Sequence, residues 1–232
     1  MGTIDIDTSS KIITISSNII CYGNAADYEI STQIAEEIES MWNEPNGTVS
    51  LYNSDFFVRF KISAQYNSLL SAQSIIENEN PKNNYIRIEE YSKLNISCMD
   101  AIGSNTGYFQ RNNLSVGCTT AAHEYGHSLG LLHPKELNIV GKGRPSIMYP
   151  RGTFVNPEFQ YDINVKPGEG GGTLNPVHRK VMQVDIDNLQ LNKLIENEIF
   201  VIGKFTNKYH EMQVKELFSF LRNSDIYSNA KL

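Results

Sequence analysis

Short runs in which apolar and polar side chains alternate fill much of the first half of the chain. Such alternation predicts β-strands, because successive side chains of a strand point to opposite faces of a sheet. The runs occupy residues 3–22, which a polar turn divides in two, and residues 48–52, 56–62 and 85–88. Shorter strand-like pieces follow over residues 94–118, so the first half of the chain predicts a sheet.

Two segments show the spacing of a helix instead. Isoleucines recur every four residues at positions 30, 34 and 38. Residues 25–43 therefore predict a helix with one apolar face, and the proline two residues later ends it. A second helical pattern runs over about residues 119–130 and ends at a glycine.

The second half of the chain predicts long loops and short regular elements. Residues 134–174 hold five prolines and three consecutive glycines. Asn175-Pro176 is typical of a helix start, and the segment that follows predicts a helix over about residues 176–192. The tail predicts a strand over residues 199–202 and a last helix over residues 214–221.

This order of elements predicts an α+β fold, with residues 1–232 in one domain of two lobes. The N-terminal lobe spans residues 1–133 and includes the second predicted helix. The C-terminal lobe spans residues 134–195, and residues 196–232 form a C-terminal extension.

Composition and charge exclude several classes of protein. Hydrophobic residues make up 40% of the chain and charged residues 20%, which excludes wholesale disorder. There are 26 acidic and 20 basic residues, a net charge of −6 without a basic cluster, so we expect no nucleic-acid partner. No apolar run is long enough to predict a transmembrane segment, and the N-terminus does not resemble a secretory signal.

The three cysteines, Cys21, Cys98 and Cys118, are too few for a disulfide scaffold. One disulfide with a spare thiol and three free thiols both fit the sequence. Cys118 lies five residues before His123 and has two interpretations. It could cap a metal ion as a thiolate, or it could be a small buried residue at a helix start, which is the commoner fate of a free cysteine.

Candidate chemistry is concentrated in residues 123–133, whose sequence is His-Glu-Tyr-Gly-His-Ser-Leu-Gly-Leu-Leu-His. His123 and His127 are four residues apart, so on a helix both imidazoles point from one face and suit two ligands of one ion. Gly130 favours a sharp turn that ends the helix and brings His133 back as a third ligand. Three imidazoles and one water make the open tetrahedral arrangement of a catalytic zinc site.

Glu124 follows the first of these histidines and is rotated from it by about 100° on a helix. It can therefore reach the region beside the metal without binding the metal. We predict that Glu124 is the general base, which takes a proton from the metal-activated water and later hands it to the leaving amine. The alternative, that the three histidines serve only a helix surface or the core, leaves their joint spacing with the glycine unexplained.

A second motif, Ser146-Ile147-Met148-Tyr149-Pro150, follows the third histidine after a short loop. With both motifs the chain resembles the metzincin zinc endopeptidases, in which a methionine turn forms an apolar floor below the metal; Met148 matches that methionine. Residues 121–133 and 147–150 are most similar to the matrixins, whereas His133-Pro134 is more like the serralysins. Residues 185–190 faintly resemble the C-terminal helix of the matrixins.

The resemblance implies a twisted, mostly parallel sheet with an active-site helix, and a small, loop-rich C-terminal lobe with a terminal helix. It implies one catalytic zinc ion and leaves calcium open. We expect no second zinc site, since only His178 and His210 remain. We expect His178 to be exposed at a helix start or to contact substrate, and His210 to be solvated. Because Pro150 stands where some metzincins carry a tyrosine ligand, Tyr149 is not assigned that role.

The resemblance also implies how a peptide would bind. An edge strand within residues 94–112 would pair with an extended substrate through backbone hydrogen bonds. The loop over residues 151–174 would form the wall of the pocket for the side chain just past the cleaved bond. Tyr149, Phe154 and Tyr161 are the candidate pocket residues, and the alternative is that they only pack the loop.

We therefore expect a monomeric, zinc-dependent metalloendopeptidase that cleaves peptides or proteins. As in metzincins, we expect it to be secreted, in an extracellular or exported location. Two alternatives stay open: a zinc- or peptide-binding module without turnover, and a protease domain delivered as a toxin or effector. The second alternative is suggested by the lack of a recognisable propeptide or leader in the sequence.

Overall fold

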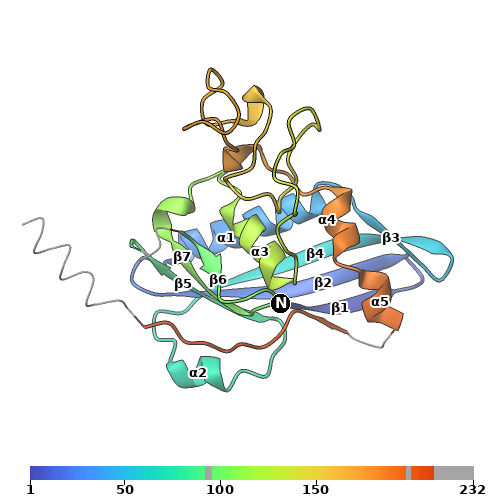
Figure 1. Ribbon diagram of the computed structural model, residues 1–232. Helices are drawn as coiled ribbons and strands as arrows, with labels where there is room; N and C mark the ends of the chain where they lie inside the picture. Colours follow the sequence, from blue (N-terminus) through green and yellow to red (C-terminus); the bar gives the residue numbers. More distant parts are fainter. Residues whose placement is uncertain (92–95, 197–199, 212–232) are drawn as a thin grey trace, which may run out of the picture.

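One sheet of mixed direction forms the base of the molecule (Figure 1). The computed structural model describes residues 1–91, 96–196 and 200–211. Within these ranges eight strands take part: β1 (Gly2–Asp7), β2 (Ile12–Tyr22), β3 (Thr48–Leu51), β4 (Ser54–Tyr66), β5 (Asn83–Glu89), β6 (Cys98–Met99), β7 (Thr106–Gln110) and β8 (Val201–Ile202). Their order is β3-β4-β2-β5-β7-β6, and β1 pairs with both β2 and β8.

The expectation of a mostly parallel sheet describes only the central strands. β4, β2, β5 and β7 run parallel to one another, whereas β3 and β6 at the two edges pair antiparallel, as does β1 with both β2 and β8. The β3–β4 hairpin closes through Tyr52 and Asn53, both with positive φ (51° and 56°). A two-residue turn of this kind fits the twist of an antiparallel pair, so the short connection dictates the direction of the edge strand.

The long strand β2 joins two parts of the sheet. Along one side it pairs with β4 over nearly its whole length. Along the other side, residues 12–16 pair with β1 and residues 18–22 pair with β5. β2 therefore carries the N-terminal strand and the central parallel strands on a single backbone, and its apolar side chains, such as Ile13, Ile15 and Ile19, lie in the core.

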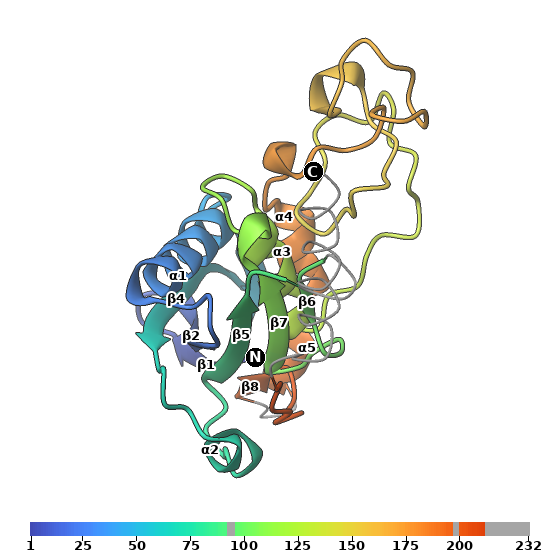
Figure 2. The same ribbon diagram turned by 90° about the vertical axis from the view of Figure 1, so that its left-hand side faces the viewer.

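Two helices pack over one face of the sheet (Figures 1 and 2). α1 (Tyr28–Asn43) begins at Asp27, whose carboxylate accepts a hydrogen bond from the N–H of Ile30. α3 (Thr120–Ser128) packs against α1, while the short helix α2 (Ala72–Ile76) lies apart at the bottom of both views. None of the helices described in the structure is long and apolar enough to cross a membrane.

The predicted helix over about 176–192 is wrong as one element. The structure has a 3₁₀ turn η3 (Pro176–His178), a helix α4 (Gln183–Asn188) and a helix α5 (Leu191–Glu196). Between η3 and α4 the backbone is extended at Arg179 and Met182, and this interrupts the expected helix. The N–H of Lys180 donates to the carbonyl oxygen of Pro145, so this hydrogen bond goes to a distant loop rather than to a helix.

The segment over residues 134–174 is loop, as predicted, apart from a 3₁₀ turn η2 (Pro157–Phe159). It stands above the helices and away from the sheet (Figures 1 and 2). Isolated bridges tie it together, among them Asn138 to Phe154 and Gln160 to Leu174. Its apolar centre is small, with Ile139, Val155 and Leu174 buried together.

Residues 200–211 are packed against the sheet. The predicted strand over 199–202 is present in its last two residues as β8, which pairs with β1, while residue 199 lies outside the described residues. The N–H of Lys204 donates to the carbonyl oxygen of Gly103. Asn105, fully buried, holds the next residues: its Oδ1 accepts from the backbone N–H groups of Thr206 and Asn207. The helix predicted over 214–221 lies outside the described residues.

The buried amide of Asn105 generates a test of this attachment. In Asn105→Ala the two backbone N–H groups lose their acceptor, so we expect the free energy of unfolding to fall by about 2–4 kcal/mol. Urea denaturation measures the change. Asn164→Ala, which alters an exposed loop side chain, is the control and should stay within about 0.5 kcal/mol of the parent protein. Equal unfolding free energies for the two variants would contradict the attachment.

Candidate metal centre

Three hydrogen bonds to side chains of neighbouring elements hold helix α3 in place. The Glu37 carboxylate of α1 accepts from the N–H of Ala122 in the first turn of α3, where no side chain of α3 itself caps the helix. Trp42, fully buried, donates its indole N–H to the carbonyl oxygen of Ala122. The hydroxyl of Tyr125 bonds to Ser17 in β2. α3 is therefore fixed to both α1 and the sheet before any metal binds.

A glycine turn ends α3. Gly130 has φ +104°, a conformation that favours glycine, and nothing lies within 4 Å of the position a Cβ would take. The N–H of Gly130 donates to the carbonyl oxygen of His127, and the N–H of Leu131 donates to that of Gly126. This pair of bonds is a Schellman motif, so the backbone conformation at Gly130 reverses the chain.

The turn brings three histidines together. The Nε2 atom of His133 lies 3.1 Å from Nε2 of His123 and 3.0 Å from Nε2 of His127. The Nδ1 atom of His123 lies 2.6 Å from the carbonyl oxygen of Ile147, and Nδ1 of His127 lies 2.8 Å from that of Leu131. Each of these Nδ1 atoms must donate, so both Nε2 atoms present lone pairs towards the common centre.

This donor set fits a zinc ion. Nitrogen ligands at 2.0–2.1 Å around a tetrahedral ion are roughly 3.3 Å apart, close to the spacing found here. Burial lowers the pKa of His123 well below its usual value, and it also lowers the pKa values of His127 and His133. Neutral imidazoles are the form that binds metal. In the part of the chain that the structure describes, these three residues form the one such group of His, Cys, Asp or Glu side chains.

Glu124 lies beside this group but is not part of it. Its carboxylate is buried, and Oε2 accepts a hydrogen bond of 3.1 Å from the backbone N–H of Met99 in β6. Burial raises the pKa of Glu124 to about 8, while the hydrogen bond from Met99 opposes that shift. A divalent cation nearby would favour the carboxylate form.

Met148 packs directly under α3. It is buried, and a Cβ built on Gly126 would lie 2.3 Å from the Met148 sulfur and 3.2 Å from the Trp42 ring. Because Gly126 has no side chain, the turn that carries Met148 can pack directly against α3 between His123 and His127. Ile147, the preceding residue, supplies the carbonyl oxygen that contacts His123.

A buried carboxyl group supports the methionine turn. Asp185 of α4 is almost fully buried, and its Oδ2 accepts from the N–H of Met182 at 2.8 Å. Burial raises its pKa to about 6, and contacts with Ser146 and Ile147 oppose the shift. Asp185 thus joins α4 to the turn whose carbonyl oxygen orients His123.

Two cavities meet at His133. One, of about 350 Å³, is lined by His123, Glu124 and His133 together with Pro150, Arg151 and Gly152. The other, of about 600 Å³, lies on the side of Tyr149 and Met148. Phe154 and Tyr161 line neither cavity: the Phe154 ring packs over Gly168, and Tyr161 is half exposed. Of the loop that follows Tyr149, Pro150, Arg151 and Gly152 line the smaller cavity.

The remaining sulfur and imidazole groups lie away from the three histidines. All three cysteines are free thiols, and Cys118 is buried with its sulfur 3.8 Å from a Glu37 oxygen. This position agrees with a small buried residue at the helix start. His178 is half-buried at the end of η3, against the ring of Phe159.

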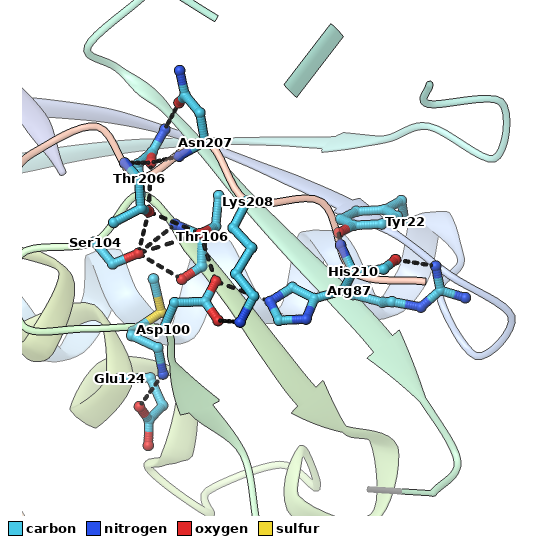
Figure 3. Close-up of polar contacts among 12 residues, drawn as sticks. Tyr22, Arg87, Asp100, Ser104, Thr106, Glu124, Thr206, Asn207, Lys208 and His210 are labelled. Carbon is cyan, nitrogen blue, oxygen red and sulfur yellow. Dashed lines mark hydrogen bonds and ion pairs between the residues drawn. The ribbon is translucent and has the colours of Figure 1, made fainter. Parts of the chain in front are cut away.

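The C-terminal extension contributes contacts that the sequence did not indicate (Figure 3). Asp100 follows Met99, and its Oδ2 lies 2.6 Å from the hydroxyl of Thr106 and 2.9 Å from Nε2 of His210. Its Oδ1 pairs with Lys208 at 3.0 Å. Burial would raise the pKa of Asp100, but the contacts with His210, Thr106 and Lys208 hold it below its usual value. His210, which we expected to be solvated, instead contacts Asp100, the residue that directly follows β6.

Comparison with known proteins identifies partial structural likeness. No known family and no curated protein matches the sequence. Among solved structures, archaemetzincin from Methanopyrus kandleri is similar with a TM-score of 0.40 and 11% identity, over 77% of this chain and 96% of that chain. Myroilysin is similar with a TM-score of 0.28 and 13% identity, over 56% of this chain and 54% of that chain. Likeness at these TM-scores does not assign the chain to a family.

The raised pKa of Asp185 predicts a pH effect on stability. Between its usual pKa of 3.8 and about 6, the folded protein keeps a proton that the unfolded chain releases. Stability from this group is therefore complete at low pH and is lost as the pH rises towards 6. Relative to Asp185→Asn, the unfolding free energy of the parent protein should fall by about 2 kcal/mol between pH 4 and 6.5. Urea denaturation at several pH values measures it, and a constant difference would contradict it.

Proposed function

We propose that the chain is a zinc-dependent endopeptidase. The observation that carries this proposal is the convergence of three imidazoles beside a buried carboxyl group, with Nε2 of His133 only 3.1 Å and 3.0 Å from Nε2 of His123 and His127. His123, His127 and His133 would hold one zinc ion and leave a fourth position open. The cavity that reaches both His133 and Glu124 would admit the peptide bond.

The residues around this position have distinct tasks. Zinc held there would polarise a peptide carbonyl group and lower the pKa of a water molecule. Glu124, as general base, would take the proton of the attacking water and hand it to the leaving amine. The N–H of Met99 keeps one carboxylate oxygen oriented, which leaves the other free for the proton. The carbonyl oxygens of Ile147 and Leu131 hold the two imidazoles of α3 in the binding tautomer.

The finer assignment follows the resemblance of residues 119–150 to the metzincins, with the matrixins most similar. In that assignment Met148 is the apolar floor of the metal site, and residues 1–232 form one bilobed, monomeric peptidase domain that acts outside the cell. The short edge strand β6 is then the strand that pairs with an extended peptide, in line with its place at the end of the sheet.

Metal content tests the ligand set. We expect the purified protein to bind one zinc ion per chain. His127→Ala should lower zinc affinity by more than about 100-fold, because losing a ligand costs more than losing a residue that only orients one. Competition with a chromogenic chelator measures the affinity. His178→Ala is the control and should bind zinc as the parent protein does. Equal affinities in both variants would contradict the ligand set.

Glu124→Gln tests the general base. The amide can still accept the Met99 hydrogen bond but cannot take a proton, so we expect the zinc content to stay the same and kcat/KM to fall by about 10³-fold. A fluorogenic peptide library measures turnover. Glu136→Gln changes an exposed carboxylate of the neighbouring loop and should retain full activity. Turnover in Glu124→Gln equal to that of the parent would contradict its role, and zinc binding with no cleaved peptide in the parent would favour a binding module.

A further inference from the structure

Arg179 is a buried arginine in the cavity that holds Glu124. It follows η3 directly, and its backbone N–H donates to the carbonyl oxygen of Pro176. The hydroxyl of Thr119 donates to the same carbonyl oxygen and accepts from Nε of Arg179 at 3.1 Å. Nη1 of Arg179 donates to the carbonyl oxygen of Tyr149. These bonds fix the guanidinium plane at the wall of the cavity.

The guanidinium has no carboxylate partner. The Arg179 residue is 4% exposed, yet no described carboxylate forms an ion pair with its side chain. Two buried carboxyl groups interact electrostatically with Arg179 without forming an ion pair with it. Glu37 accepts a hydrogen bond from the N–H of Ala122, and Glu124 accepts one from the N–H of Met99. A buried charge without a partner is costly, and such a charge in a cavity indicates a ligand that supplies the opposite charge.

Donor atoms of this guanidinium remain available to the cavity. Of the five N–H donors of an arginine, two are used by Thr119 and Tyr149. Nη2 has no partner among the described residues and is not one of the buried polar atoms cut off from solvent. Burial lowers the pKa of Arg179 to about 10, so the group stays charged at neutral pH.

Positively charged side chains outnumber carboxylates among the residues that line the cavity. A second arginine, Arg151, lines the rim and is exposed, with its guanidinium 3.5 Å from the side-chain oxygen of Asn113. Apart from Glu124, the described lining residues carry no carboxyl group. The lining therefore holds two guanidinium groups against one carboxylate, and a bound zinc ion would add to the positive charge.

From this geometry we infer that the cavity selects a carboxylate of the substrate next to the cleaved bond, and that Arg179 is the residue that determines this specificity. The inference rests on the proposed peptidase function. A guanidinium binds a carboxylate through two parallel N–H bonds, which fits a group that approaches the free edge of Arg179. The carboxylate could belong to an aspartate or glutamate side chain or to the C-terminus of a peptide, and both present the same chemistry.

A binding measurement tests the inference without relying on turnover. The probes are two peptide hydroxamates that bind zinc and differ only in a glutamate or a glutamine next to the hydroxamate. With the zinc-loaded full chain we expect the glutamate form to bind at least about 10-fold more tightly, the effect of one charge-assisted pair. Equal affinities, or binding of neither probe, would overturn the inference.

Variants of the arginine identify the source of the preference. Arg179→Met should reduce the glutamate preference to within about 2-fold of unity, and Arg179→Lys should keep part of it because the charge remains. Arg59→Met, which removes a guanidinium that lies over the Phe57 ring in β4, is the control and should keep the full preference. An equal loss of affinity for both probes in Arg179→Met would overturn the inference, since it would mean a structural role.

An exposed residue keeps the test decisive if Arg179→Met does not fold. Arg151→Glu places a negative charge at the rim and should lower the glutamate preference several-fold, while an unchanged preference would overturn the inference. Cleavage of peptides with glutamate or glutamine beside the bond, each with a free or amidated C-terminus, separates the two sources of carboxylate. Preference for either source supports the inference, and preference for neither overturns it. Selective probe binding without any cleavage would instead remove only the peptidase proposal.

Discussion

Two backbone carbonyl oxygens govern the candidate metal centre. Ile147 and Leu131 each hold the Nδ1 atom of one imidazole of α3, and this fixes which nitrogen faces the common centre. A histidine on a helix can otherwise rotate about χ1 and χ2, and a free ring would not keep its lone pair on one point. The two carbonyl oxygens come from different loops, so the centre exists only when both loops are packed against the helix.

The need to place these two carbonyl oxygens explains much of the surrounding structure. Leu131 is positioned by the turn at Gly130, whose hydrogen bonds close the end of α3. Ile147 is positioned because Met148 fits against the bare backbone of Gly126 and because Asp185 contacts the same turn from α4. The packing of α3 against α1 and the sheet fixes the helix, and the loop residues Leu131 and Ile147 fix the rings on it.

The parts of the structure that were predictable from the sequence are those that local spacing determines. The strands of the first half, helix α1 and the meeting of His123, His127 and His133 follow from periodicity and from a glycine at a helix end. The helix expected over 176–192 failed because Lys180 bonds to the distant Pro145, a contact that no local pattern shows. Arg179 and His210 were missed or misplaced for the same reason: an arginine after a turn and a histidine in a tail carry no signal until the fold brings Thr119 or Asp100 to them.

Segments from both ends of the described chain support the residue that orients Glu124. The N–H of Met99 orients Glu124, and the next residue, Asp100, is held by Lys208 and His210 in the C-terminal segment. That segment is in turn attached through β8 to the N-terminal strand β1. β6 has only two residues, too short to hold its own position at the edge of a sheet. The orientation of the buried carboxylate therefore depends on the packing of residues 200–211, although none of them touches it.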